Sequence, residues 1–116
     1  MLRKKRQVRL ADAIRDIIAN CITQTLNDPR VREVVITQVR LSGDLQLATV
    51  YFRIFDEKTS KEEAKKGLEG CRGLFRRMVG DAVDLRRVPE LRFFYDESIE
   101  KGARIEHLIA TINSKE

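Results

Sequence analysis

Residue types that build metal and redox sites are scarce in this sequence. Its 116 residues include a single histidine, His107, and two cysteines, Cys21 and Cys71. Tryptophan is absent altogether. The cysteines lie far apart and match neither zinc-ligand spacing nor a CxxC redox pair. We therefore expect no metal and no cofactor, and we interpret both cysteines, which have apolar neighbours, as buried reduced thiols.

Long apolar runs are absent as well. No run of about 7 to 15 apolar residues could form the core of a signal peptide, and none approaches the roughly 20 residues of a membrane span. Proline and glycine are sparse, at two and six residues, and 42% of the chain is hydrophobic. This composition is typical of one compact domain, which we place over 1–116. We expect a cytoplasmic monomer with neither a membrane nor a small-molecule partner.

The sequence has an excess of positive charge. It carries 23 lysines and arginines against 18 acids, a net charge of +5 with a pI of about 9.5, which favours a polyanionic partner. One concentration is at the amino terminus, where we expect a basic arm over residues 1–6. Its members and near neighbours are Arg3, Lys4, Lys5, Arg6 and Arg9. A second concentration follows near the middle of the chain, at Arg72, Arg76, Arg77, Arg86 and Arg87.

The first half of the chain predicts a helix and a hairpin. Apolar residues from Leu10 to Ile22 recur at the helical period, and Asn27-Asp28-Pro29 ends a helix of about five turns. Two runs rich in β-branched residues follow, Glu33–Leu41 and Leu45–Phe55. The three residues between them, Ser42, Gly43 and Asp44, predict a tight glycine turn. On the second run, alternate residues form the core face, namely Ala48, Val50, Phe52 and Ile54.

The second half begins with a broken helical stretch, Thr59–Val88. Thr59 or Ser60 can cap it, and Gly67, Gly70 and Gly73 interrupt its apolar stripe. Each glycine costs about 1 kcal/mol in a helix, so we predict two helices that meet at a tight junction.

Pro89 stops the second of these helices. Glu90–Tyr95 then predicts a third strand on which Leu91, Phe93 and Tyr95 alternate, parallel to a neighbour because a helical crossover precedes it. For 97–116 we expect a short helix and a flexible tail.

These elements predict an α+β fold in the order α-β-β-α-kink-α-β. A three-stranded mixed sheet would carry the helices on one face. This is also the element order of a type II KH domain.

Three sequence patches resemble bacterial ribosome-binding factor A. They are RQVRLADAIRDIIANCITQTLNDPRV, ITQVRLSGDLQLATVYF and PELRFFYDESIEKGARIEHL, and together the resemblance covers about Arg6 to Leu108. It implies a KH-like, non-enzymatic assembly factor that binds the immature small ribosomal subunit and its precursor ribosomal RNA. It also implies a role in late maturation of that RNA, which matters most in the cold.

The glycine junction leaves two interpretations open. The family usually has an Ala-x-Gly helix kink in place of the KH Gly-x-x-Gly loop, and the corresponding residues here are Cys71, Arg72 and Gly73. Because Gly70 precedes them, Gly70-Cys71-Arg72-Gly73 is also formally a Gly-x-x-Gly with a basic residue inside. It could hold phosphate as in a generic KH protein, since glycine leaves backbone N–H groups open to close approach.

If the partner is RNA, phosphate contacts should supply most of the affinity. The candidate RNA-binding residues are Arg3, Lys4, Lys5, Arg6, Arg9, Arg72, Arg76, Arg77, Arg86 and Arg87. Tyr51 and Phe94 are candidates for base stacking, with core packing as the alternative.

Two other functions compete with RNA binding. A hydrolytic site can be imagined from the acids and histidine near the carboxyl end, but no nucleophile has a base beside it, so we expect no enzyme activity and no catalytic residues. Its members would be Asp96, Glu97, Glu100, Glu106 and His107. The exposed edge of the sheet could instead dock an extended peptide, which would make the chain a protein-binding module.

Overall fold

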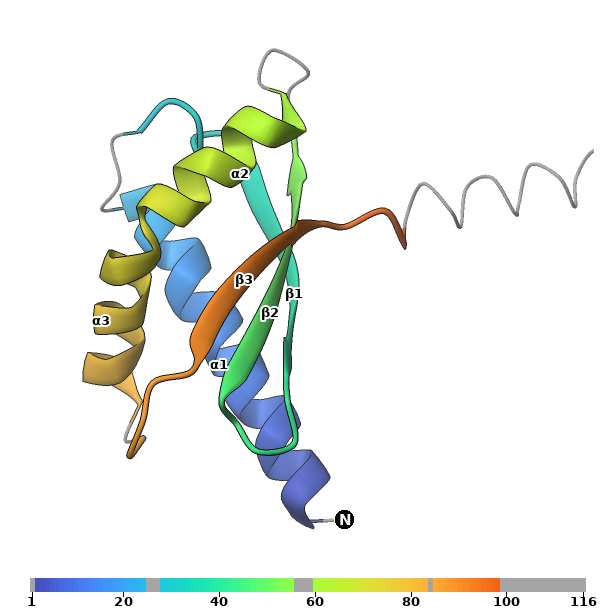
Figure 1. Cartoon of the computed structure of the whole chain (residues 1–116), viewed down its shortest axis with the longest axis vertical. Helices are drawn as coiled ribbons and strands as arrows, with labels where there is room; N and C mark the ends of the chain where they lie inside the picture. The colour runs from blue at the N-terminus through green and yellow to red at the C-terminus, as the bar shows by residue number, and fades with distance from the viewer. Residues whose placement is uncertain (1, 25–27, 56–59, 84, 99–116) are drawn as a thin grey trace, which may run out of the picture.

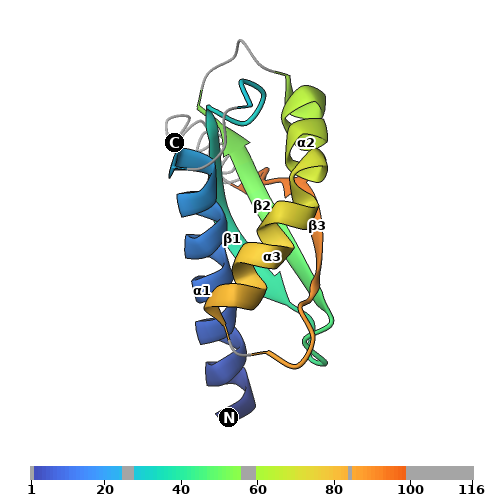
Figure 2. The same ribbon diagram turned by 90° about the vertical axis from the view of Figure 1, so that its left-hand side faces the viewer.

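Three helices lie against one face of a three-stranded sheet in the computed structural model of the chain (Figures 1 and 2). The structure describes residues 2–24, 28–55, 60–83 and 85–98, with side chains from Lys5 onward. The elements are α1 (Leu2–Gln24), β1 (Val34–Leu41), β2 (Leu47–Ile54), α2 (Lys61–Gly70), α3 (Arg72–Ala82) and β3 (Glu90–Tyr95). The predicted α+β class and the element order are confirmed. The helix and tail expected over 97–116 fall almost entirely outside the described residues.

The sheet has the order β1-β2-β3 and is mixed, as predicted. β1 pairs antiparallel with β2, and β2 pairs parallel with β3. The parallel pair follows from the connection, because α2 and α3 carry the chain back along the sheet before β3 begins. A register shift between Ile36 and Gln38 interrupts the first ladder at Thr37. β3 is an edge strand, and α2 packs along it.

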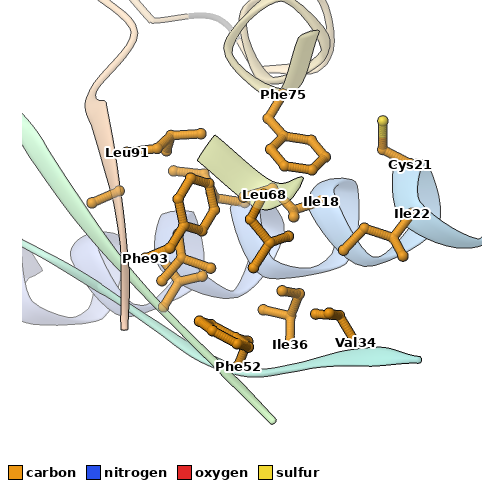
Figure 3. Close-up of a cluster of buried hydrophobic side chains, with 14 of the residues drawn as sticks. Ile18, Cys21, Ile22, Val34, Ile36, Phe52, Leu68, Phe75, Leu91 and Phe93 are labelled. Atoms are coloured by element: carbon orange, nitrogen blue, oxygen red, sulfur yellow. The ribbon is translucent and has the colours of Figure 1, made fainter. Parts of the chain in front are cut away.

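The core lies between the sheet and the helices (Figure 3). β2 contributes Ala48, Val50 and Phe52, each at most 1% exposed, which confirms the predicted core face, and Ile54 is half-buried beside them. The Phe75 and Phe93 rings meet with centroids 5.9 Å apart, which joins α3 to β3. Burial of each such side chain contributes about 1.5–3 kcal/mol. The other residues labelled in the close-up are Ile18, Cys21, Ile22, Val34, Ile36, Leu68 and Leu91.

The first helix begins earlier than the apolar pattern places it. α1 starts at Leu2, so that residues 2–6 form its first turns and not a separate arm. Leucine, lysine, arginine and glutamine are good helix formers, so this segment extends the helix without a strong apolar stripe of its own. The Gln7 side chain also donates a hydrogen bond to the carbonyl oxygen of Leu41, which fixes this end of α1 beside the sheet.

The hairpin turn also differs from its prediction. The strands end at Leu41 and resume at Leu47, and the left-handed residue is Leu45, with φ of 60°, although Gly43 was the expected turn residue. Side-chain bonds stabilise the turn: the Ser42 hydroxyl donates to Asp44 Oδ1 at 2.6 Å and accepts from the Leu47 N–H at 3.0 Å. Leu45 packs against the core, and this contact offsets the cost of its backbone conformation.

Candidate nucleic-acid interface

A single residue separates α2 from α3. Ser60 caps α2, its hydroxyl accepting a hydrogen bond from the Glu63 N–H at 3.1 Å, and the helix ends at Gly70. The N–H of Cys71 donates to the carbonyls of Gly67 and Leu68, at 3.2 and 3.1 Å, and its carbonyl accepts from the Phe75 N–H at 3.0 Å. The chain therefore changes direction at Cys71 while almost all of its backbone stays helical (Figure 2).

The glycines at this junction differ in their surroundings. A Cβ on Gly67 would lie 2.9 Å from Val31 Cγ1, so this glycine lets α2 approach the segment before β1 closely. A Cβ on Gly73 would meet nothing within 4 Å, and no glycine of the described chain has a positive φ. The kink of the predicted element order is confirmed, and Gly67 is a packing residue within α2. Phosphate binding by Gly70-Cys71-Arg72-Gly73 stays a prediction.

Arg30 lies beside the junction although its sequence position gives no sign of it. The guanidinium donates to the Asp28 carboxylate through Nη2 at 2.8 Å and Nε at 3.1 Å. These bonds hold the pKa of Asp28 below its usual value. The pair is close to neutral, so Arg30 adds little net charge at the junction. Burial raises the pKa of the half-buried Cys71 thiol next to it, which favours the neutral form.

Several positive side chains surround a hollow between α3, the segment before β3, and the hairpin turn. We call this hollow, of about 680 Å³, the basic groove. A smaller hollow of about 160 Å³ adjoins it, shares Arg76, Glu90 and Arg92 with it, and adds Arg72 and Leu91. The basic groove is lined by Ser42, Asp44, Gln46, Leu47, Arg76, Arg87, Val88, Glu90 and Arg92.

Contacts within the protein position two of these arginines. Arg76 donates from Nη2 to the Val88 carbonyl at 3.2 Å, which ties α3 to the segment before β3. The Arg72 guanidinium lies over the Phe93 ring, 6.0 Å from its centroid. Both side chains belong to exposed residues and keep further N–H groups available for an anion.

Two carboxylates oppose the arginines of the groove. Asp44 accepts from the Ser42 hydroxyl and from the Gln46 N–H, and these bonds lower its pKa, so it is charged at neutral pH. Glu90 is exposed at the start of β3. With four arginines, Arg72, Arg76, Arg87 and Arg92, against these two acids, the two hollows keep a net positive charge suited to phosphate.

The structure thus joins three of the ten candidate RNA-binding residues, Arg72, Arg76 and Arg87, in one place. Arg77 and Arg86 are exposed but do not line the groove.

The amino-terminal candidates lie on α1. Lys5, Arg6 and Arg9 are exposed along it, while the side chains of Arg3 and Lys4 lie outside the described residues. The bond from Gln7 to Leu41 places this part of α1 beside the hairpin, whose next residue, Ser42, lines the groove.

Arg92 is the residue that sequence reasoning missed. The strand ELRFFY was interpreted through its alternating apolar residues, and alternation puts Arg92 on the other face with Phe94. Its partner across the ladder is Thr49 on β2, and its position on an edge strand lets the side chain reach the groove. The alternation alone could have indicated an outward arginine, but its neighbours Arg72 and Arg76 follow only from the packing of α3.

The imagined hydrolytic site lies mostly beyond the described residues, which include only Asp96 and Glu97 of its five members. Asp96 is 5% exposed and accepts hydrogen bonds from the hydroxyls of Thr37 and Ser98. Those bonds, Ser98 first, hold its pKa below the usual value. Within the described ranges no group of three potential metal ligands occurs, and no described helix is long and apolar enough to cross a membrane.

Comparison with known proteins gives one consistent family. The family model of ribosome-binding factor A matches residues 6–109. The ribosome-binding factor A of Geotalea uraniireducens is 37% identical over 112 residues, covering 97% of this chain and 92% of the relative. That of Leuconostoc citreum is 37% identical over 115 residues, covering 98% of each chain.

Solved structures agree with the sequence comparison. The crystal structure of ribosome-binding factor A from Thermus thermophilus superposes with a TM-score of 0.69 at 28% identity, over 77% of this chain and 94% of that one. A homology model of the Thermus protein, fitted into a cryo-EM map of its complex with the 30S subunit, gives a TM-score of 0.64 at 27% identity, over 78% and 96% of the chains.

Proposed function

The chain belongs to the ribosome-binding factor A family, and from this premise we propose that it binds the small ribosomal subunit by placing RNA phosphates in the basic groove. The observation that carries the proposal is the meeting of Arg72, Arg76, Arg87 and Arg92, from α3, β3 and the segment between them. The Thermus relative has been fitted in a complex with the 30S subunit, which supports the same partner for this chain.

Electrostatics favour RNA as the ligand of the groove. Guanidinium groups bind phosphate oxygens through paired N–H donors, and each contact releases counterions from the nucleic acid. The groove is hollow and open to solvent, so a backbone can enter without unfolding any element. Lys5, Arg6 and Arg9 on α1 would extend the contact past the hairpin turn.

We place the activity at a late stage of assembly, following the resemblance to the family. The factor would bind the immature subunit and its precursor ribosomal RNA in the cytoplasm, as a monomer and without catalysis, and assist late RNA maturation, chiefly in the cold. Cells depleted of the protein should then accumulate precursor small-subunit RNA, more strongly at low temperature. Normal precursor levels at all temperatures would overturn this part of the proposal while leaving subunit binding intact.

The central test is sedimentation with mature and precursor small subunits. Arg76→Glu should weaken binding about ten-fold or more, because it removes a charge-assisted contact and adds a repulsive charge. The matched control is Arg77→Glu, which makes the same change of charge at the next residue of the same helix, outside the groove. Equal losses in the two variants would mean that total charge matters and the groove does not.

A further inference from the structure

An aromatic pair lies on the face of the sheet opposite the helices. Tyr51 on β2 is the ladder partner of Phe94 on β3, and their ring centroids are 6.5 Å apart with an interplanar angle of 39°. Alternation directs their neighbours Phe52 and Phe93 into the core, so this pair faces outward. Phe94 is 44% exposed. The described helices lie on the other face of the sheet (Figure 1).

Cations surround the two rings. The Arg40 guanidinium lies over Tyr51, 5.8 Å from the ring centroid, and Lys65 Nζ lies over Phe94 at 5.2 Å. The neighbouring row of paired residues on the same face of the sheet consists of Arg40, Thr49 and Arg92. This row puts positive charge along one side of the aromatic pair. Arg92 also lines the basic groove, so the pair and the groove are joined through this arginine.

Asp96 and Glu97 lie on the other side of the pair, and Glu90, which shares its face of β3 with Arg92 and Phe94, lies on the groove side. Asp96 and Glu97 follow the end of β3 and line a hollow of about 270 Å³ together with Arg40 and Tyr51. The Asp96 carboxylate is engaged by Thr37 and Ser98, and Arg53 lies close enough to lower its pKa. The face therefore carries Arg92 with Glu90 on the groove side of the rings, and Arg53 with Asp96 and Glu97 beyond them.

We propose that Tyr51 and Phe94 form a stacking platform for two bases of single-stranded RNA that continues from the basic groove. Charge complementarity selects this occupant, because a strand whose phosphates contact Arg92 and Arg40 would place its next bases over the outward-facing rings of Tyr51 and Phe94. Arg40 and Lys65 are surface side chains that can move aside or cover the stacked bases from above. The inference rests on the proposed function, since the groove must hold the same RNA.

The test compares two RNA probes and uses the full chain. One is a single strand of about eight nucleotides, and the other is identical except that its central nucleotides lack bases. The wild-type protein should bind the base-bearing probe about ten-fold more tightly. Phe94→Ala and Tyr51→Ala should reduce that affinity to the level of the abasic probe and leave the abasic affinity unchanged, whereas Phe94→Tyr, which keeps a ring, should retain the preference.

A spectroscopic readout separates stacking from general binding. The chain has no tryptophan, so Phe94→Trp would introduce a unique reporter whose emission stacked bases should quench. Quenching by the base-bearing probe but not by the abasic one would support the platform, even if alanine variants fold poorly.

Several outcomes would overturn the platform. Equal affinity of wild type for the two probes would do so and leave the groove intact, whereas binding of neither probe would remove both. Arg76→Glu should weaken binding of both probes equally, because it impairs the groove and leaves the platform unchanged. Emission of the Phe94→Trp variant that responds to RNA-free small-subunit proteins and not to RNA would assign the face to a protein partner.

Discussion

Gly67 of α2 lies against Val31 so closely that a methyl group on the glycine would stand 2.9 Å from Val31 Cγ1. Such a distance is shorter than van der Waals contact, and Val31 is buried at 1% exposure, so it has little room to move. The Arg30 Cβ would lie 3.0 Å from the same methyl group. The close packing of α2 on the segment that leads into β1 therefore depends on the missing side chain.

Gly67→Ala is predicted to lower the free energy of unfolding. The added methyl group must displace Val31 or Arg30, and overpacking of this kind costs about 1–3 kcal/mol, more than the roughly 1 kcal/mol that alanine gains in a helix. Gly73→Ala is the matched control, because its methyl group would enter open space and should leave the protein equally or more stable. Chemical denaturation of both variants measures the difference. Equal stabilities would show that Gly67 does not hold this contact.

The pattern of the sequence was enough to predict the layers of the fold. Alternation on β2 identified Phe52 as a core residue, and three glycines indicated the junction between two helices. These features are local, because a residue's place in a strand or helix fixes the direction of its side chain.

What the sequence could not provide depended on contacts between distant segments. Leu45, and not Gly43, adopts the left-handed conformation because its side chain finds a place against the core. Arg92 joins the groove because α3 packs beside an edge strand, and Arg30 reaches the junction because Gly67 lets α2 approach. Of the candidate site, the arginines of α3 were foreseen, but their partner from β3 was not.

The Ser60 cap should contribute measurably to α2. Its hydroxyl satisfies the Glu63 N–H, which has no partner within the first turn of the helix. Ser60→Ala is predicted to lower the free energy of unfolding by about 1 kcal/mol, and Ser60→Asp, which can accept the same bond, to preserve it. Thermal unfolding of wild type and the two variants at equal pH measures these differences. An unchanged unfolding midpoint in Ser60→Ala would show that the cap does not stabilise α2.

Asp96 should make the free energy of unfolding depend on pH. Its folded pKa is held below the unfolded value of about 3.9, so the carboxylate stabilises the protein fully above that value and loses its contribution as the pH falls through the folded pKa. Asp96→Asn is predicted to cost about 1–2 kcal/mol at pH 7, and the difference from wild type should shrink towards zero in strong acid.

Urea unfolding at a series of pH values from about 7 down to about 2 measures the Asp96 effect. Asp28 and Asp44 also have lowered pKa values, so the quantity to follow is the difference between wild type and variant and not the wild-type curve alone. Asp81→Asn, on the exposed surface of α3, serves as the control. A constant difference at every pH would show that the Asp96 side chain acts through packing and not through its charge.

Salt dependence should distinguish groove arginines from other surface arginines. Each phosphate contact adds about one to the slope of log affinity against log salt, because binding releases about one counterion. Arg92→Gln is therefore predicted to reduce the slope for binding to small subunits by about one, and Arg77→Gln to leave it nearly unchanged. Both changes remove one charge, so their effects on net charge are the same. Equal slopes would mean that the surface binds RNA as a diffuse positive field, and the convergence of arginines at the groove would then have no role in affinity.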